Sequence, residues 1–493
     1  MWMGLARSLR WFWREYRRDR VGVVGLVLLA VLVFIAVAFP LVGDSSVIAN
    51  WNNYEYFKFY PKAVPPCWAS MFTGKKYTKT VFEPGSSIVV AVDRGEDGLL
   101  HVWINASFPV TGDTPPNDVI LVADMYYRGG PFYVDRFAVV RPDGSVVDIV
   151  SPGSRVPLGL VFGGVSSRSG NVSGLAVRLH SIVQNAFFVQ RYVIPSLREQ
   201  GFGVSFADAP IVSLNLFRAL FSSDVGGVLA GSESSVLRGE YRWVVRVVGP
   251  GGSVFSFVPR RLVVSGSCYG VLGTDDRGHD LWQGFLYGVR WALIVGLVTS
   301  ALSVFIGSVY GVVAGYFGGI VDEVLLRFAQ IVYSLPMLPI LILLAALYRP
   351  SIWLIVAALV VFSWQGTSFV TRAIALQVRQ EPYVESAIAL GAGTLRVIFL
   401  YVYPQVLPYV FASIALSVPS AIITEASLSF LGVGDPSVLT WGRILHEAEV
   451  RNAALNGYWW WVVPPGLGIA LVGLTFIFIG SALDRLLNPR LKR

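Results

Sequence analysis

EPYVESAIALGAGTLRVIFLYVYP, residues 381–404, is a polar segment between two long apolar runs. Pro382 suits the first turn of a helix, where its missing N–H leaves no hydrogen bond unmade. Gly391 suits the residue just past a helix end, where a positive φ is favourable without a Cβ. The segment therefore predicts a short helix over residues 382–390, followed by a glycine hinge.

A second short helix is predicted after the hinge. Thr394 can cap its start, because a threonine hydroxyl can accept a hydrogen bond from the first turn. The helix should end before Pro404, since proline pushes the preceding residue out of the α region. The apolar residues that this helix carries are Leu395, Ile398 and Phe399.

One face of the first helix is predicted to be apolar. Tyr383, Ala387 and Leu390 follow the i, i+4, i+7 spacing of a single helix face, whereas Glu385 and Ser386 point elsewhere. The two short helices and their hinge thus form an element that we expect to lie outside the bilayer, at a membrane surface.

This element resembles the cytoplasmic coupling loop of binding-protein-dependent ABC transporter permeases. The consensus of that loop is Glu-Ala-Ala, three residues, glycine, nine residues and then Ile-x-Leu-Pro. The residues that match at this spacing are Glu385, Ala387, Gly391 and Pro404. The residues that depart, all at small or apolar positions, are Ser386, Tyr401 and Tyr403. The resemblance implies contact with an ATPase subunit through Tyr383, Glu385, Ser386, Ala387, Leu390, Gly391, Arg396 and Pro404.

The composition is that of a membrane protein. The chain is 54% hydrophobic, has a mean hydropathy of +0.60 and is 14% charged, whereas soluble proteins are about 25% charged. Its net charge of +8 does not indicate nucleic acid, because the basic residues lie at the ends of apolar runs without a nucleic-acid-binding motif. We therefore expect a lipid bilayer around the chain. The two cysteines lack metal-ligand spacing, so no metal site is expected.

Six apolar runs have the length of a membrane span. The first, residues 21–43, follows a basic and aromatic segment, residues 1–20, that suits a cytoplasmic amphipathic helix. A cleaved signal peptide is the alternative for this run, but the run is longer than a typical apolar signal segment. The excess of Lys and Arg predicts that both termini are cytoplasmic. The other five runs are residues 291–314, 327–347, 352–373, 409–430 and 464–483.

Several residues within these runs are unusual for a simple span. Pro336 and Pro339 interrupt the third run and Pro419 the fifth, which suits helices that line a cavity. Glu425 lies near the outer end of the fifth run, where an ionisable group is costly unless it faces water or a partner. We predict that Glu425 faces the translocation cavity; the alternative is a carboxylate that reaches out to the outer interface.

Residues 44–269 have a different pattern and predict a mostly β domain. Short runs rich in Val, Ile and Phe alternate with turn pairs such as Asp143-Gly144. Residues 242–258 predict a hairpin, and residues 175–200 have a more helical pattern. After a first span that starts in the cytoplasm, this domain must be extracytoplasmic. The predicted strands are residues 87–92, 118–123, 137–140, 241–248 and 253–258.

Cysteines and sequons agree with an extracytoplasmic location. Cys67 and Cys268 lie near the two ends of the domain, so a bond between them would close its base, and disulfides persist outside the cytoplasm. Two unrelated buried thiols are the alternative. Asn105 and Asn171 begin N-x-S sequons and are candidate glycosylation sites, although such triplets often arise by chance.

Further segments resemble the second membrane subunit of the dipeptide/oligopeptide permeases. The resemblance covers roughly residues 5–43 and 270–493 and leaves out residues 44–269, so it implies nothing about the role of the β domain. A docking or shielding platform for a binding protein, a stability role and a lattice contact all stay open for that domain. The segments that carry the resemblance are residues 272–297, 314–327, 425–432 and 488–491.

The resemblance implies a polytopic α-helical membrane protein, with six transmembrane helices in the type I ABC importer permease fold and an inserted β domain. It implies a subunit of an ATP-driven importer of peptides, or of related solutes such as oligosaccharides, in a prokaryotic cytoplasmic membrane. The implied partners are a homologous permease subunit, two cytoplasmic ATPase subunits and an extracytoplasmic solute-binding protein. The chain has no Walker A loop, so ATP would bind to the partners and no cofactor to this chain. A membrane-anchored receptor whose outer β domain senses a ligand is the alternative.

Overall fold

The computed structural model describes residues 13–163 and 165–487. The chain divides into two compact units: a helical unit, built from the chain up to Trp51 and from Leu281 onward, and a β unit, Asn52–Asp280. Both limits of the β unit lie later in the chain than the predicted residues 44 and 269. Most of the predicted amphipathic helix over residues 1–20 lies outside the described residues, and residues 13–16 form a helical turn.

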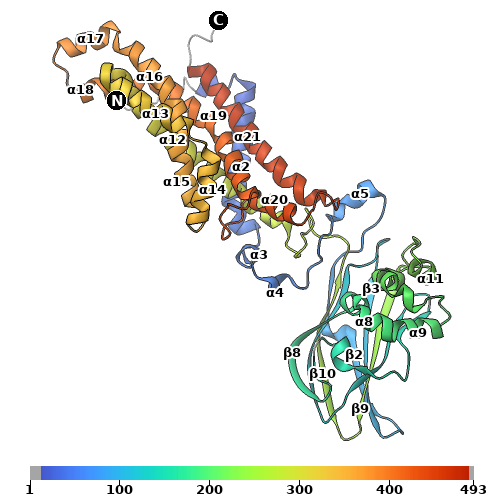
Figure 1. Ribbon diagram of the computed structural model, residues 1–493. Helices are drawn as coiled ribbons and strands as arrows, with labels where there is room; N and C mark the ends of the chain where they lie inside the picture. The colour runs from blue at the N-terminus through green and yellow to red at the C-terminus, as the bar shows by residue number, and fades with distance from the viewer. Residues whose placement is uncertain (1–12, 164, 488–493) are drawn as a thin grey trace. The chain divides into compact units, whose positions relative to one another are not determined.

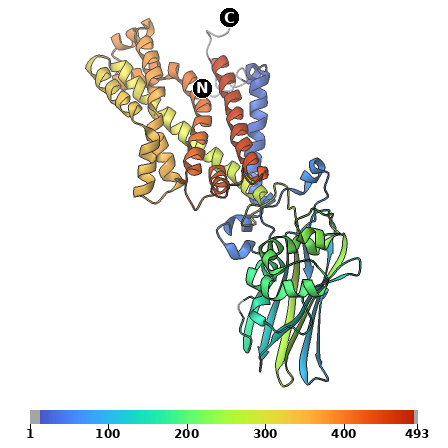
Figure 2. The same cartoon turned by 45° about the vertical axis from the view of Figure 1, so that its right-hand side comes forward.

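Long apolar helices dominate the helical unit (Figures 1 and 2). Within the described residues, five continuous helical stretches are long and apolar enough to cross a membrane, and a bent helix pair would make a sixth. The five contain α2 (Arg20–Val42), α12 (Leu281–Phe317), α15 (Ile352–Ser363) with α16 (Gln365–Arg379), α19 (Tyr403–Phe430) and α21 (Trp459–Leu487). The bent pair is α13 (Gly319–Ser334) and α14 (Met337–Leu347). The shorter elements are α3 (Ser45–Ala49), α17 (Pro382–Ala389), α18 (Thr394–Val397), η5 (Ile398–Val402) and α20 (Trp441–Val450).

Proline accounts for the bend between α13 and α14. The two helices meet at 69°, and Leu335, just before Pro336, has the extended angles φ −72° and ψ 131°. Proline disfavours the α region for the residue before it, so α13 has to end there. The predicted interruption of the third span is thus confirmed. Pro419, by contrast, is accommodated inside a continuous α19.

Glycines let α12 and α16 approach each other closely. A Cβ at Gly307, Gly311 or Gly315 of α12 would collide with a backbone carbonyl oxygen in or next to α16. These oxygens belong to Trp364, Ser368 and Arg372 respectively. Small residues at such spacings bring membrane helices into direct backbone contact, where packing replaces the missing hydrophobic driving force. This contact fixes α16, from whose end the polar segment of residues 381–404 continues.

The two ends of the helical unit's chain are joined. Asp19 caps α2 by accepting hydrogen bonds from the N–H groups of Val21 and Gly22. The same carboxylate pairs with Arg485 in the last turn of α21, with 2.7 Å between Nη2 and Oδ2. The start of α2 and the end of α21 therefore lie together, at the end of the helical unit that also carries α17 and α18 (Figures 1 and 2).

The β unit is a pair of antiparallel sheets, as the predicted mostly β domain requires. One sheet has the order β1-β10-β4-β8, and the other has the order β2-β3-β9-β5-β6 with β7 paired to β5. Inward residues alternate with outward ones along β3 and β9, so that the inner faces build one continuous core. The strands are β1 (Val81–Pro84), β2 (Ile88–Arg94), β3 (Leu99–Val110), β4 (Asp118–Arg128), β5 (Tyr133–Val140), β6 (Val146–Val150), β7 (Val156–Pro157), β8 (Ser169–Arg178), β9 (Gly239–Pro250) and β10 (Val254–Ser265).

Short helices complete the β unit. Most of them lie between β7 and β9, and they add buried apolar side chains to the core of the sheets. They are α4 (Tyr54–Phe57), η1 (Cys67–Ala69), α5 (Ser70–Thr73), η2 (Gly85–Ser87), α6 (Leu158–Val161), α7 (Leu179–Gln184), α8 (Ala186–Phe188), η3 (Val189–Val193), α9 (Ile194–Glu199), η4 (Phe206–Asp208), α10 (Ala209–Leu220) and α11 (Val225–Leu229).

Two expectations for the β unit need correction, and one is confirmed. The predicted hairpin over residues 242–258 is wrong, because β9 and β10 belong to different sheets. The predicted helical stretch over residues 175–200 begins later, since β8 continues to Arg178. Cys67 and Cys268 form the predicted disulfide. That bond ties the start of the unit to its final segment.

Candidate functional site

The first half of residues 381–404 folds as predicted. Pro382 occupies the first turn of α17, and the helix ends at Ala389. Gly391 has φ +83°, its N–H donates to Ile388 O at 2.9 Å, and the N–H of Ala392 donates to Ala387 O at 3.1 Å. These two bonds satisfy the last carbonyls of the helix in the Schellman pattern, which requires a left-handed residue at position 391.

The predicted apolar face of α17 is divided between an exposed and a buried part, and a second buried residue, Val384, was not predicted. Val384 is fully buried and Ala387 is 7% exposed, whereas Tyr383 is 43% exposed and Leu390 is 89% exposed. Val384 packs in a cluster with residues of α12, α16 and α18. The helix therefore docks through an i, i+3 pair. Ala387 belongs to the docked face, and Tyr383 and Leu390 belong to the exposed one.

The second half departs further from the sequence prediction. The side chain of Thr394 makes no capping bond, and Gly393 takes the N-cap position of α18. The helix does not end before Pro404: α18 leads through the π turn η5 into α19, where Pro404 lies in the first turn. A π turn widens the helix locally, so that a proline ring can follow it without interrupting the helix.

The exposed surface of this loop combines apolar and charged side chains. Leu390 is 89% exposed and Leu395 is 71% exposed; Glu385, Ser386 and Arg396 are also exposed. Arg396 forms no ion pair with any residue that the structure describes. Large apolar side chains beside charges of both signs, on a small protrusion, are typical of a surface that binds another protein.

The base of the loop is held by polar contacts that the sequence analysis missed. Arg372 of α16 pairs with Asp322 of α13, with 2.5 Å between Nε and Oδ1 and 2.6 Å between Nη2 and Oδ2. Arg379, the last residue of α16, donates to Phe317 O at 3.3 Å. The bidentate geometry fixes the relative orientation of α13 and α16. A polar cavity of about 350 Å³ opens beside the Arg372–Asp322 pair.

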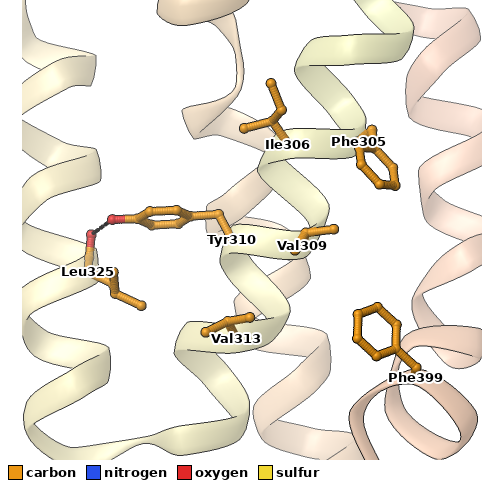
Figure 3. A pocket seen from close by; sticks show the side chains of 7 residues that line it. All are labelled: Phe305, Ile306, Val309, Tyr310, Val313, Leu325 and Phe399. Carbon is orange, nitrogen blue, oxygen red and sulfur yellow. Dashed lines mark hydrogen bonds between the residues drawn. The ribbon is translucent and has the colours of Figure 1, made fainter. Parts of the chain in front are cut away.

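An apolar cavity of about 480 Å³ lies nearby (Figure 3). Tyr310 points across it and donates its hydroxyl to Leu325 O at 2.7 Å, so its polar atom is already used. The lining is apolar almost throughout, so the cavity suits an apolar group. It is lined by Phe305, Ile306, Val309, Tyr310, Val313, Leu325 and Phe399.

Glu425 is held by hydrogen bonds within the chain. The residue is only 4% exposed, and its side-chain Oε1 accepts a hydrogen bond from Ser429 Oγ at 2.7 Å. Thr440, the N-cap residue of α20, forms a second side-chain hydrogen bond with it. The carboxylate joins α19 to the start of α20. That Glu425 also faces the translocation cavity stays a prediction.

The two sequon asparagines have different surroundings. Asn105 is half-buried in β3, which is paired on both sides by β2 and β9. Asn171 is exposed on β8, at the edge of its sheet. Only Asn171 therefore has the open surroundings that a glycan needs.

One titratable side chain in the β unit is unusual. The ring of His180 packs edge-on against Phe217, with centroids 4.7 Å apart, and its Nδ1 has no hydrogen-bond partner among the described atoms. Burial lowers the pKa of His180 below 6.5; the charges of Arg178 and Arg218 act in the same direction, and that of Asp118 opposes them. The imidazole is therefore held in its neutral form.

Comparison with known proteins places the loop within a matched region. Residues 307–493 match the family model described as a binding-protein-dependent transport system inner membrane component, and residues 9–58 match that of the N-terminal TM domain of oligopeptide transport permease C. Residues 59–306, which contain most of the β unit, lie outside both matches.

Three curated relatives are similar to the chain. It is 34% identical over 257 residues to the dipeptide transport system permease protein of Bacillus subtilis, a match that covers 51% of this chain and 80% of that protein. It is 34% identical over 223 residues to the oligopeptide transport system permease protein of Haemophilus influenzae, covering 45% and 71%. The oligopeptide transport system permease protein of Bacillus subtilis is 32% identical over 222 residues, covering 45% and 72%.

Proposed function

The chain belongs to the family of inner-membrane components of binding-protein-dependent transport systems, and we propose that it forms half of the translocation path of an ATP-driven peptide importer. It is a multi-pass membrane protein and a permease subunit. The substrate proposed is a peptide, because the similar proteins are named for dipeptides and oligopeptides. Related solutes such as oligosaccharides would need a different set of contacts in the path.

The observation that carries the coupling role is the construction of residues 381–404. Val384 and Ala387 fix α17 to the helical unit, and Glu385 and Leu390 stay exposed. A short helix with a fixed base and a free mixed surface fits a groove on another protein, in the manner of a helix-in-groove complex. We assign that groove to a cytoplasmic ATPase subunit, in agreement with the Glu385, Ala387, Gly391 and Pro404 match to the coupling loop.

The packing of the loop provides a route for coupling. Val384, Val397 and Ile398 share one cluster with residues of α12, α16 and α19, and η5 leads directly into α19. A displacement of α17 would therefore move the ends of several spans together. When the ATPase subunits close, the loop moves with them, and the spans change between inward-facing and outward-facing arrangements. ATP supplies the free energy, and the chain supplies different contacts in the two states.

The remaining partners and the topology complete this proposal. The family model describes one component of a binding-protein-dependent transport system, so further subunits are expected. We assign to this chain a homologous permease as the second half of the path, two cytoplasmic ATPase subunits and an extracytoplasmic solute-binding protein. The Asp19–Arg485 pair joins the start of α2 to the end of α21, which supports both termini on one side of the membrane. We assign them to the cytoplasmic side of a prokaryotic membrane, because Lys and Arg are in excess there. The β unit would then face outward, where its disulfide persists.

A membrane-anchored receptor is not favoured. The family matches over residues 9–58 and 307–493, which contain most of the spans, both describe components of transport systems. The β unit keeps a supporting role in the proposal, as a docking or shielding platform for the binding protein.

Co-purification tests the coupling role. Glu385→Lys reverses a charge on the exposed face of α17, and Glu323→Lys makes the same change on α13, where Glu323 is 71% exposed in its side chain. When the transporter subunits are co-expressed, the ATPase subunits should remain with the Glu323→Lys chain and be lost or reduced with the Glu385→Lys chain. Equal recovery with both variants would contradict the assignment of α17 as the docking element.

A further inference from the structure

A short segment of the β unit exposes large apolar side chains. Residues 68–76, which we call the aromatic finger, comprise most of η1, all of α5 and the turn after it, and α5 stands clear of the two sheets (Figures 1 and 2). Met71 and Phe72 are each 83% exposed, and Trp68 is 38% exposed. The rings of Trp68 and Phe72 touch edge-on, with centroids 6.0 Å apart.

The finger is held rigidly at both ends. Cys67, just before it, is bonded to Cys268, and Trp68 Nε1 donates to Val271 O at 2.6 Å. At the other end, the N–H of Lys76 donates to Asp113 Oδ2 at 3.0 Å. The exposure of the apolar tip is therefore a feature of a fixed structure. Leaving such side chains in water forgoes the free energy that their burial would supply.

Positive charge accompanies the apolar tip. Lys75, Lys76 and Lys79 are exposed, and residues 67–80 contain no acidic residue. The nearby carboxylate of Asp113 is paired with Arg238. Apolar and aromatic side chains flanked by lysines are typical of segments that enter the headgroup region of a membrane, where the rings reach the acyl boundary and the ammonium groups meet phosphates.

The chain keeps this segment near a membrane span. Val271, which accepts the hydrogen bond from Trp68, is separated from α12 only by residues 272–280. Even fully extended, that connection reaches about 35 Å. A bilayer around α12 is therefore within the reach of the finger. The fixed apolar tip, the lysines and the short connection together favour a lipid surface over a soluble protein.

We propose that the aromatic finger inserts into the bilayer surface beside the chain's own spans. Met71 and Phe72 enter the upper part of the acyl region, Trp68 lies at the interface, and Lys75 and Lys76 bind lipid phosphates. The finger would then hold the β unit against the membrane through a second attachment besides the chain itself. This inference depends on the membrane spans and is independent of the transported substrate.

Lipid quenching tests the proposal on the full-length chain. The native cysteines are bonded to each other, so Phe72→Cys adds the one free thiol, which is labelled with an environment-sensitive fluorophore under non-reducing conditions. Val89→Cys, at a position that is 61% exposed on β2, provides the control. The labelled proteins are placed in nanodiscs of phosphatidylglycerol and phosphatidylcholine in equal parts, with or without lipids that carry a shallow spin-label quencher.

The shallow quencher should reduce emission from position 72 and leave position 89 unchanged. Adding Lys75→Gln and Lys76→Gln should lower the insertion equilibrium roughly 25-fold in these discs, since each lysine at an anionic surface contributes about fivefold. Equal emission with and without quencher at position 72 would overturn the proposal. So would quenching that is identical at position 89, or a label at position 72 that becomes shielded only after an extracytoplasmic binding protein is added.

Discussion

Replacing Gly391 by alanine should loosen the end of α17 without creating a clash. Gly391 has φ +83°, and a Cβ there would meet no other atom within 4 Å. The cost is therefore one of backbone conformation alone, about 1–2 kcal/mol for a residue with a Cβ in the left-handed region. A cost of that size lowers the ratio of molecules in which the Gly391 and Ala392 N–H bonds are formed to molecules in which they are broken by about 5–30-fold. Gly391→Asn should cost less, because asparagine tolerates this region.

Gly393→Ala is a matched control for this change. A Cβ at Gly393 would likewise meet no other atom within 4 Å, but the φ of Gly393 is −67°, which any residue adopts. Hydrogen exchange should report the hinge directly through the N–H groups of Gly391 and Ala392, which bond to Ile388 O and Ala387 O. In the Gly391→Ala chain, the amides at positions 391 and 392 should exchange about 5–30 times faster than in wild type. Gly393→Ala should leave both amides unchanged.

The reasoning extends to function. If the Schellman end sets the direction of α18, coupled ATP hydrolysis should be highest in Gly393→Ala, lower in Gly391→Asn and lowest in Gly391→Ala. Exchange and coupled turnover in Gly391→Ala that match those of Gly393→Ala would refute the role assigned to the positive φ.

Three further predictions concern stability. Replacing Cys67 and Cys268 by serine should destabilise the β unit by about 5 kcal/mol, the chain-entropy value for a separation of 201 residues. Hydrogen exchange of the β3 and β9 amides would measure this loss, and unchanged protection would contradict it. Glu425→Gln should cost roughly 1–3 kcal/mol of stability by disturbing a buried hydrogen-bonded carboxylate, and the unfolding temperature in detergent should fall. Ser427→Ala, on an exposed part of the same helix, should leave that temperature unchanged. Equal unfolding temperatures for the two variants would exclude a stabilising role of the Glu425 carboxylate. His180 has a folded-state pKa below its unfolded value of about 6.5, so the unfolded state takes up the proton first and the β unit should lose stability as the pH falls below about 6.5. His180→Phe should remove that slope, and an identical pH dependence in the variant would assign it to other groups.

Local signals in the sequence were sufficient for the first half of the loop. Pro382 and Gly391 act on their own backbone angles, so their effects do not depend on the surrounding fold. The buried face of α17 depends on which neighbours surround it, and Val384 was missed for that reason. Pro404 was misread because the π turn before it, which lets the helix continue, has no recognised sequence signal.

Contacts between residues far apart in the sequence could be predicted only where the sequence leaves a single choice. The Cys67 and Cys268 pair could be predicted because a chain with two cysteines offers one possible intramolecular bond. The strands β9 and β10 have the alternation of a hairpin, but alternation reports which face is buried and not which sheet a strand joins. The place of Glu425 in an apolar run indicated that its carboxylate needs water or a partner. Its hydrogen-bond partners in the chain, Ser429 and Thr440, could not be predicted, because the contact with Thr440 depends on how α20 docks on α19.

Cross-linking of α17 to an ATPase subunit tests the central claim most directly. Ser386→Cys adds an exposed thiol beside Glu385, and Leu455→Cys adds one at a position that is 86% exposed in the connection between α20 and α21. In a reconstituted complete transporter, Ser386→Cys should cross-link to an ATPase subunit, and the cross-link should stop ATP-dependent peptide uptake; Leu455→Cys should do neither. Peptide uptake that continues with α17 cross-linked, or a working transporter in which Ser386→Cys never reaches an ATPase subunit, would contradict the account.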